Sequence, residues 1–402
     1  SKKAAPATYV KICDAYGAGF YTIPGTDTCV KVGGYVRVDY DYRPERKNSV
    51  TATTNTAGTD NTTSGFYNRG TIQLDARTAT SMGVARTFMA LRLETGAGVQ
   101  FKDKTVSSLE GAFVQWAGFT AGQAAHPFAF MSSWAYNTHY WGGWPNGVRQ
   151  LTYTAVLGGG FSTTFGVTDM QNYNAVAGTS ATTIHMPGYN GVIYVGNVRY
   201  DQSWGSVQVM AAGHTGGNLT GGTATATTDV GTKESGYAVG VGASFKLPML
   251  AAGDELQLTA VYTDRLMNLL ADSTINTPSS SAYGSNPVGG PAAAFANGTG
   301  WVVGAQLRHY WTGNLRSQFY ASYTSREQHF LTGGVKGTGN ATSIATALIY
   351  SPAKDFDIGL EVNYIRASFN QAAAASVSGY TGTTNGIDVN NIVTKLRVQR
   401  NF

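Results

Sequence analysis

Charged residues are scarce in this 402-residue chain, at 13% against about 25% in soluble proteins. The chain also lacks any run of about 18 apolar residues, which excludes a membrane-spanning helix. No GxSxG, HExxH or P-loop pattern occurs, and the six histidines are scattered without the spacing of metal ligands. We therefore expect no enzyme, no metal site and no cofactor. What is abundant is glycine, with 51 residues, and tyrosine, with 23, which is typical of strands and turns.

Apolar and polar residues alternate with a period of two in many short stretches. In residues 29–43 (CVKVGGYVRVDYDYR) the even positions are mostly valine and tyrosine, whereas Lys31, Arg37 and Asp39 fall on the other face. The pattern predicts about sixteen strands. They are expected at residues 29–43, 67–78, 85–96, 108–116, 119–123, 148–157, 161–168, 191–200, 206–214, 236–247, 255–264, 301–311, 315–325, 343–351, 356–369 and 391–402.

The connections between these strands alternate between short turns and long polar loops. An even number of strands with loops sorted in this way indicates an all-β fold, an antiparallel transmembrane β-barrel of the outer-membrane type. Closure leaves no unpaired sheet edge in lipid. Aromatic residues near the predicted strand ends fit two interfacial girdles. They are Tyr40, Tyr42, Tyr194, Tyr200, Trp204, Tyr262, Trp301, Trp311, Tyr323, Tyr350 and Tyr364.

Three kinds of region depart from the simple pattern. In residues 108–116 the alternation is poor, because Glu110 and Gln115 fall on opposite faces, and a strand packed against another subunit would tolerate this. The long neutral loops at 215–235 and 265–298 are expected to cover the outer vestibule, next to lipopolysaccharide. A third region, residues 123–147 (QAAHPFAFMSSWAYNTHYWGGWPNG), is rich in aromatics but follows no strand or helix period, so it needs a place outside the wall.

The amino-terminal residues SKKAAP contain no apolar signal region, so we expect an exported chain whose signal peptide has been removed. Cys13 and Cys29 lie sixteen residues apart around a glycine-rich turn. This spacing suits a local disulfide, worth about 3 kcal/mol in the loop-entropy model, while two buried free thiols are the alternative. The disulfide implies an oxidising compartment. Residues 1–27 are expected to form a periplasmic segment and residues 28–402 a single barrel.

Two segments and the last residue resemble a known family. Val10 to Tyr42 contains the cysteine pair flanking a DAYGAGF turn, and Leu109 to Gly122 reads LEGAFVQWAGFTAG. Both resemble the general porins of alphaproteobacteria, of the rhizobial and Brucella type. The terminal Phe402 resembles the aromatic carboxy-terminal signal of outer-membrane porins, and the resemblance implies a location in the bacterial outer membrane.

The resemblance implies a homotrimer of sixteen-stranded barrels in which the loop after the fifth strand folds into the lumen as a constriction. Here that loop is Ala124 to Gly147, which contains no Asp or Glu, whereas the family's loop often carries carboxylates. Its candidate pore residues are instead aromatic, histidine or methionine. They are His126, Met131, Trp134, Tyr136, His139, Tyr140, Trp141 and Trp144. The rings either bind passing solutes or pack on the wall and hold the loop in shape.

The predicted inward faces also carry charge. The basic candidates are Arg37, Arg69, Arg77, Arg86, Arg92, Lys395 and Arg397, and the acidic ones are Asp39, Asp75 and Glu94. Arg37, Arg92, Lys395 and Arg397 are expected to form one basic patch, with Arg77 and Arg86 lower and Arg69 higher. Such a patch favours anions, in line with the net charge of +5, unless pairing with the carboxylates neutralises it.

The leading hypothesis is a channel for passive diffusion of small hydrophilic solutes and ions, with mild anion selectivity. The alternatives are a solute-selective channel for sugars or aromatic or organic acids, which uses the aromatic loop, and a surface adhesin acting through Thr-rich loops. Expected partners are membrane lipid, lipopolysaccharide and two further copies of the chain. Nucleic acid is not expected, because the basic residues alternate along strands and do not gather on one surface.

Overall fold

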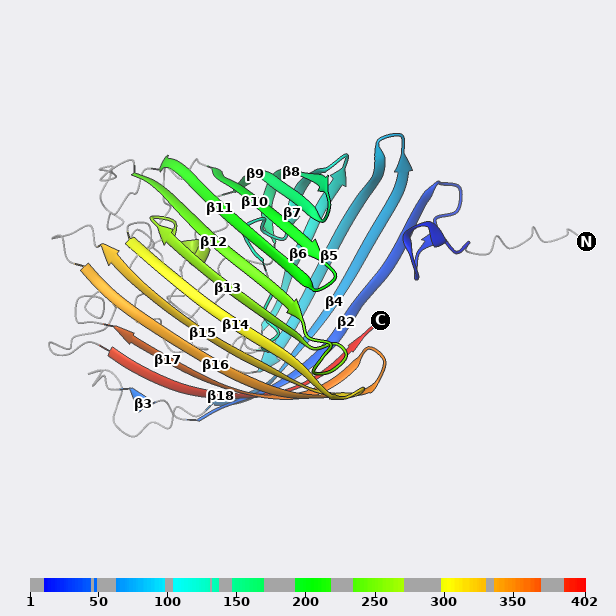
Figure 1. Ribbon diagram of the computed structural model, residues 1–402. Coiled ribbons are helices and arrows are strands. Elements are labelled where there is room, and N and C mark those ends of the chain that lie inside the picture. The colour runs from blue at the N-terminus through cyan, green and yellow to red at the C-terminus, as the bar shows by residue number, and fades with distance from the viewer. Residues whose placement is uncertain are drawn as a thin grey trace, which may run out of the picture.

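The computed structural model describes residues 11–44, 47–48, 63–97, 104–130, 132–136, 147–169, 192–217, 234–270, 298–329, 336–369 and 387–402. These residues form a closed antiparallel barrel of sixteen long strands (Figure 1). The long strands are β2 (Thr28–Arg43), β4 (Thr63–Thr80), β5 (Gly83–Ala97), β6 (Lys104–Trp116), β7 (Phe119–Ala124), β8 (Val148–Gly158), β9 (Phe161–Asp169), β10 (Val192–Gln202), β11 (Gly205–Gly217), β12 (Glu234–Lys246), β13 (Glu255–Asp264), β14 (Gly298–Thr312), β15 (Leu315–His329), β16 (Lys336–Ala353), β17 (Phe356–Phe369) and β18 (Ile387–Asn401).

The remaining elements are short. Strands β1 (Tyr21–Thr22) and β3 (Lys47–Asn48) add single pairings to the sheet, and the 3₁₀ helices are η1 (Asp14–Tyr16) and η3 (Met267–Leu270). No helix among the described residues is both long enough and apolar enough to cross a membrane.

The barrel closes where the last strand pairs with the first long one. Arg397 of β18 lies opposite Asp39 of β2, and every other long strand pairs with its neighbours in chain order. Closure leaves no free edge to pair with another chain. The predicted sixteen-stranded all-β barrel is therefore confirmed, and the bounds predicted for β13 and β17 agree with the structure.

Two-residue turns join β4 to β5, β6 to β7, β8 to β9, β10 to β11, β14 to β15 and β16 to β17 at one end of the barrel. The turn from β8 to β9 places Gly158, Gly159 and Gly160 at φ of 87°, 62° and 91°. Three successive left-handed residues require glycine, which explains this sequence. The same end carries η1, β1 and the carboxy terminus (Figure 1).

Alternation sorts the strand residues between two faces, as the sequence indicates. Outward side chains are apolar and exposed, for example Val36 at 56%, Leu151 at 55% and Val209 at 59%. Inward side chains on β2, β4, β5 and β18 are mostly charged or polar and make hydrogen bonds to one another. The outer band suits lipid and the inner face suits water.

Strand β6 explains the poor alternation around Glu110. The register with β5 shifts there, because Leu91 lies opposite Leu109 and Ala90 lies opposite Gly111, which leaves Glu110 as the extra residue of a β-bulge. Glu110 thereby reaches Arg92, and Gln115 reaches Arg86. The expectation that the two side chains face opposite sides is wrong, because the bulge turns both toward the lumen.

The segment before β2 is closed by the predicted disulfide. Cys13 and Cys29 are bonded with a Cα–Cα distance of 6.1 Å, which is within the usual range, so the alternative of free thiols is excluded. Phe20 packs against the disulfide and also lies under the Arg77 guanidinium, 4.9 Å from its ring centroid. These contacts attach the segment to the wall at β4.

Phe402 lies against the start of the barrel. Its backbone N–H donates to the carbonyl of Gly34 at 3.0 Å and its carbonyl accepts from the Gly34 N–H at 3.1 Å. Gly34 has φ of 154°, and a Cβ there would overlap the carbonyl oxygen of Thr71 on β4. Glycine at this position therefore lets β2, β4 and the last residue approach closely.

Candidate functional site: the charged wall and the inward loop

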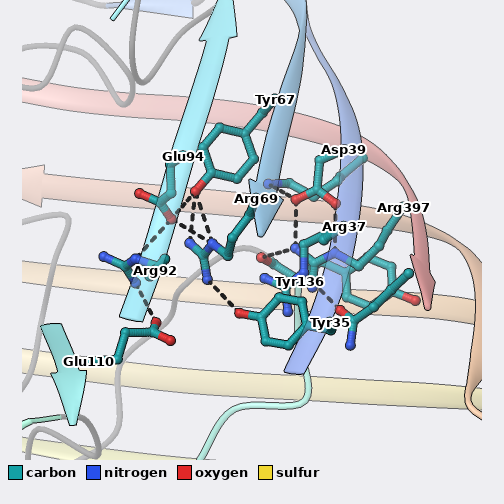
Figure 2. Close-up of polar contacts among 12 residues, drawn as sticks. Tyr35, Arg37, Asp39, Tyr67, Arg69, Arg92, Glu94, Glu110, Tyr136 and Arg397 are labelled. Carbon is teal, nitrogen blue, oxygen red and sulfur yellow. Dashed lines mark hydrogen bonds and ion pairs between the residues drawn. The ribbon is translucent and has the colours of Figure 1, made fainter. Parts of the chain in front are cut away.

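Four neighbouring strands carry a row of polar side chains across the inner wall. Cross-strand pairing places Gln399 of β18 opposite Arg37 of β2, Arg37 opposite Arg69 of β4, and Arg69 opposite Glu94 of β5. The register therefore places Arg69 directly beside Arg37 on the neighbouring strand. Figure 2 shows the Arg69 and Arg92 side chains directed toward Glu94.

Asp39 is the centre of the first ion-pair cluster. It is 1% exposed and receives two hydrogen bonds from Arg397, Nε to Oδ1 at 2.7 Å and Nη2 to Oδ2 at 2.8 Å (Figure 2). The Nζ atom of Lys395 lies 3.5 Å from Asp39 Oδ2 and 3.1 Å from Asp41 Oδ1. Two of the expected free cations are thus paired with carboxylates.

Glu94 is the centre of the second cluster. The Nε atoms of Arg69 and Arg92 lie 2.5 Å and 3.1 Å from Glu94 Oε1, and the Tyr67 hydroxyl donates to the same oxygen. Arg92 also bonds Glu110 at 2.6 Å. A third cluster joins Asp75 to Arg77 and Arg86 at 2.8 Å and 3.0 Å. Pairing with wall carboxylates therefore neutralises most of the predicted basic patch.

Arg37 is different. Its Nε donates to Gln399 Oε1 at 2.8 Å and its guanidinium lies 4.9 Å from the centroid of the Tyr35 ring. Among the residues whose side chains are described, no carboxylate lies within ion-pair distance of Arg37. Arg397 and Arg69 repel its guanidinium, and Asp39, which is bound by Arg397, attracts it more weakly. The guanidinium is half-buried at the inner surface, so it offers N–H donors to an anion in the lumen.

Residues 125–130, which follow β7, lie against the inner wall on the side of the barrel that faces β2 across the lumen. Asn197 Nδ2 of β10 donates to the Pro127 carbonyl at 2.7 Å, and Gln150 Nε2 of β8 donates to the Ala125 carbonyl at 2.7 Å. Further along, Gln306 of β14 accepts from the backbone N–H of Trp134 at 3.0 Å. The backbone polar groups of this irregular stretch are thus satisfied by wall amides.

The end of the described stretch reaches β17 and β18. The backbone N–H of Tyr136 donates to Glu361 Oε2, and its carbonyl accepts from Arg397 Nη2 at 3.3 Å. The segment 125–136, apart from residue 131, therefore follows the wall from β8 to β18. We call this stretch the inward segment.

Three wall arginines lie over three rings of the inward segment. The guanidinium carbons of Arg199, Arg308 and Arg397 are 5.3, 4.5 and 4.1 Å from the ring centroids of Phe130, Trp134 and Tyr136 respectively. Such cation–π contacts contribute about 0.5–1 kcal/mol each at exposed sites and more when desolvated. A loop without carboxylates is therefore held to a basic wall through its aromatic faces.

Two glycines of the wall make room for these rings. A Cβ on Gly242 of β12 would overlap the Phe130 ring, and a Cβ on Gly359 of β17 would overlap the Tyr136 hydroxyl. Both glycines alternate with outward apolar residues, so they face inward like the side chains that contact the inward segment. The rings can lie flush with the backbone only because no side chain is present there.

Sequence patterns identified only part of this arrangement. Among the predicted loop residues, His126, Trp134 and Tyr136 lie in the inward segment, while Met131, His139, Tyr140, Trp141 and Trp144 lie outside the described residues. The contacts made by Arg199, Arg308 and Glu361 were missed. The alternation rule that placed Arg37 inward would have found all three, because each occupies an inward position of its strand.

His126 is buried, and burial lowers its pKa from an ordinary 6.5 to about 3. Its Nδ1 accepts the backbone N–H of Phe128 at 2.9 Å, a bond that only the unprotonated nitrogen can make. The pKa is lower when the segment is docked than when it is released, so protons favour release below pH 6.5. The docking free energy should fall by about 1.4 kcal/mol per pH unit between pH 6.5 and pH 3.

We therefore expect single-channel current noise to rise when the pH is lowered from 7 to 4.5. The His126→Asn variant, which keeps an acceptor near Nδ1 but does not titrate in this range, should show a smaller acid effect. Because carboxylates also titrate in this range, the difference between the two proteins is the quantity to measure. An equal acid response in both would exclude His126 as its origin.

Among the described residues, no group of three or more His, Cys, Asp or Glu side chains is arranged to hold a metal ion. The polar clusters of the wall are ion pairs between strands. These ion pairs give the lumen a charged surface that suits water and dissolved ions.

Comparison with known proteins agrees with this architecture. A family model described as the porin subfamily matches residues 1–395. Porin Omp2b of Brucella abortus (strain 2308) is 29% identical over 214 residues, which are 51% of this chain and 56% of that protein. Porin Omp2b of Brucella melitensis biotype 1 is 28% identical with the same coverage. The matched stretch spans about half the length of these curated relatives.

Solved structures show the same fold at low sequence identity. The outer membrane channel DcaP of Acinetobacter baumannii superposes with a TM-score of 0.62 at 15% identity, covering 95% of this chain and 99% of that one. OmpF of Salmonella typhi, in complex with daunomycin, gives 0.56 at 14% identity, covering 94% and 99%. The family model that spans nearly the whole sequence and the closed sixteen-stranded barrel lead to one conclusion: the chain belongs to the porin subfamily.

Proposed function

We propose that the barrel is an outer-membrane channel through which small hydrophilic solutes diffuse passively. The family and the fold support a location in the outer membrane, where the apolar outer band meets lipid and lipopolysaccharide. The inner wall of β2, β4, β5 and β18 supplies a charged, hydrogen-bonded surface. The inward segment, as the beginning of residues 124–147, narrows the lumen.

The channel is mildly selective for anions. The observation that supports this proposal is that Arg37 faces the lumen without a carboxylate partner among the described side chains. The other wall cations of β4, β5 and β18 are paired with Asp39, Glu94 or Asp75, so their fields are largely cancelled at a distance. Arg37 has no carboxylate within ion-pair distance among the described side chains, so its charge is the least compensated of the cations on this wall. A permeating anion is attracted to this position and a cation is repelled.

Replacing Arg37 by glutamine should lower the ratio of anion to cation permeability. A unit charge about 4 Å from a permeating ion contributes about 1 kcal/mol in water, and salt at 0.1 M screens it over about 10 Å, so we expect a fall of roughly two- to five-fold. Reversal potentials in a salt gradient across a planar bilayer measure the ratio.

The Arg400→Gln variant is the matched control. It removes the same charge, but Arg400 lies opposite the outward residue Val36, is exposed on the outer face of β18, and donates to the Lys354 carbonyl, so its charge does not face the lumen. Its selectivity should equal that of the unmodified channel. A preference of the unmodified channel for cations, or equal effects of the two substitutions, would refute the assignment to Arg37.

The same geometry argues against the solute-selective alternative. One face of Trp134 and one face of Tyr136 are covered by Arg308 and Arg397, so these rings hold the segment to the wall and do not offer a continuous stacking surface. Current that saturates or is blocked by a sugar or an aromatic acid would favour the solute-selective channel. Absence of conductance would favour the adhesin.

A homotrimer is the proposed assembly, and the outer surface supports it. From β7 to β12, outward aromatic rings near the turn end form a chain of contacts, with centroid distances of 4.9 Å for Phe119–Tyr153 and 4.4 Å for Phe161–Tyr200. At this level β2, β4 and β5 instead carry small outward residues. They are Thr28, Val30, Ala76, Thr78, Ala85 and Thr87. Small side chains allow a neighbouring barrel to approach where lipid anchors are missing.

A trimer of open channels should therefore insert into a bilayer with three equal conductance steps. The Thr78→Trp variant, which places a bulky side chain on the proposed contact face, should give single steps. The Leu151→Trp variant is the control, because Leu151 lies on the lipid side of β8, where its side chain is 55% exposed. Three-step insertion should persist with Leu151→Trp, and its loss in both variants would contradict the proposed face.

A further inference from the structure

The inner wall changes character between β10 and β14. Seven inward side chains near the loop end are apolar or small, and each is at most 7% exposed. They are Ile193, Val195, Met210, Ala212, Ala238, Val261 and Val302. Their inward direction follows from alternation, because on β10 they precede Asn197 and Arg199, whose side chains contact the inward segment. A wall that faced water would be polar.

A second stretch of chain covers this apolar wall. After β13 the backbone reverses at Arg265, a non-glycine residue with φ of 54°. The Arg265 N–H donates to the Gly298 carbonyl at 2.7 Å, and its carbonyl lies 3.1 Å from His214 Nε2. The following residues return along β13 and β14 as the 3₁₀ helix η3. The large loop 265–298 was expected to cover the outer vestibule, but its first six residues instead pack inside the barrel.

The cover and the wall form one core. Leu269 and Leu270 are 0% exposed, Leu266 is 3% exposed, and all three belong to the same apolar cluster as the wall residues. Phe128 of the inward segment, 0% exposed, belongs to it too. Gly236 makes the close approach possible, because a Cβ there would overlap the Arg265 carbonyl. Burial of this kind excludes water from the site.

The opposite wall is open by comparison. The side chains of Arg69, Arg92 and Glu110, on β4, β5 and β6, are 20%, 26% and 22% exposed. A track for apolar solutes along β10–β14 would leave its lining side chains exposed to the lumen, whereas these are covered completely.

We infer that the inward segment and residues 266–270 together seal the β10–β14 side of the lumen, so that, among the described residues, the path for water and solutes lies along β2, β4, β5 and β6. Leu269, Leu270 and Phe128 are positioning residues for the channel: they define its cross-section without touching the solute. The inference rests on the proposed channel function and adds where in the barrel the path lies.

Cysteine accessibility tests this inference, and the native cysteines do not interfere because both are in the disulfide. In protein reconstituted in liposomes, a charged methanethiosulfonate reagent should modify the Gln73→Cys variant on β4, and mass spectrometry should detect the adduct. The Ala238→Cys variant on β12 faces the lumen at 0% exposure and should react at least ten-fold more slowly. Equal rates at the two positions would overturn the inference.

A second variant shows that the cover is responsible. Adding Leu269→Asn and Leu270→Asn to Ala238→Cys should raise its labelling rate at least ten-fold, and the conductance of this channel should increase. Leu250→Asn, in the exposed turn between β12 and β13, is the matched control and should leave both unchanged. A slow rate that persists after the leucine substitutions would exclude the segment as the cover.

Labelling is read by mass, so it does not depend on current. A barrel that conducts but is labelled equally at both cysteines would contradict the inference of a sealed side and leave the channel function intact. A barrel without conductance would contradict the proposed channel function.

Discussion

Replacing Asp39 with asparagine is expected to destabilise the barrel by about 3–5 kcal/mol, because the substitution leaves a buried Arg397 without its carboxylate. The pair is bidentate, Asp39 is 1% exposed, and Lys395 shares the same oxygen. The midpoint of urea unfolding, followed by the conversion of the folded band in gel electrophoresis, measures the loss. Because Arg397 loses its counter-charge, while Lys395 keeps Asp41 at 3.1 Å, the channel should also become more anion-selective.

Asp75→Asn is the control for this prediction. Asp75 has two arginine partners, like Asp39 with its Arg and Lys, but its side chain is 14% exposed and the arginines are 28–29% exposed. Water screens such pairs, so the expected cost is about 1 kcal/mol or less. Equal destabilisation by the two substitutions would mean that burial does not set the strength of the Asp39 cluster.

Replacing Gly242 with valine should dislodge the inward segment. The added side chain occupies the space of the Phe130 ring, so the ring must move away from β12 and toward the barrel axis. Overpacking of this kind typically costs about 1–3 kcal/mol. We expect a lower mean conductance and greater current noise in single-channel recordings.

The Phe130→Ala substitution should partly restore the conductance of the Gly242→Val channel, because it removes the overlapping ring. Gly70→Val serves as the control: Gly70 lies on the outward face of β4, and a Cβ there meets nothing within 4 Å. A quiet, fully conducting Gly242→Val channel would show that Phe130 does not hold the segment against β12.

The inward segment shows why loop geometry resists prediction. Composition alone revealed that residues 124–147 contain many rings and no carboxylate. It did not reveal which rings meet which wall residues, because Arg199, Arg308 and Arg397 are separated from their partners by between 69 and 261 residues along the chain and meet them only after closure. The sequence also did not reveal that the glycines at 242 and 359 make room for these rings, because glycine in a strand has several possible causes.

Strand β6 illustrates a second limit. A period of two predicts the face of every residue until one extra residue is inserted, and from there each side chain changes face. The bulge at Glu110 depends on pairing with β5, so residues 108–116 could not reveal it by themselves.

Local patterning was sufficient for the strands, the closed barrel and the disulfide, because alternation, turn glycines and cysteine spacing act over a few residues. Tertiary structure decided which wall cations are paired, and it left Arg37 without a carboxylate within ion-pair distance among the described residues. It also decided that the apolar wall from β10 to β14 is covered by Phe128, Leu266, Leu269 and Leu270. Both outcomes depend on register between strands and on contacts across the lumen, and these exist only once the ring of strands has closed.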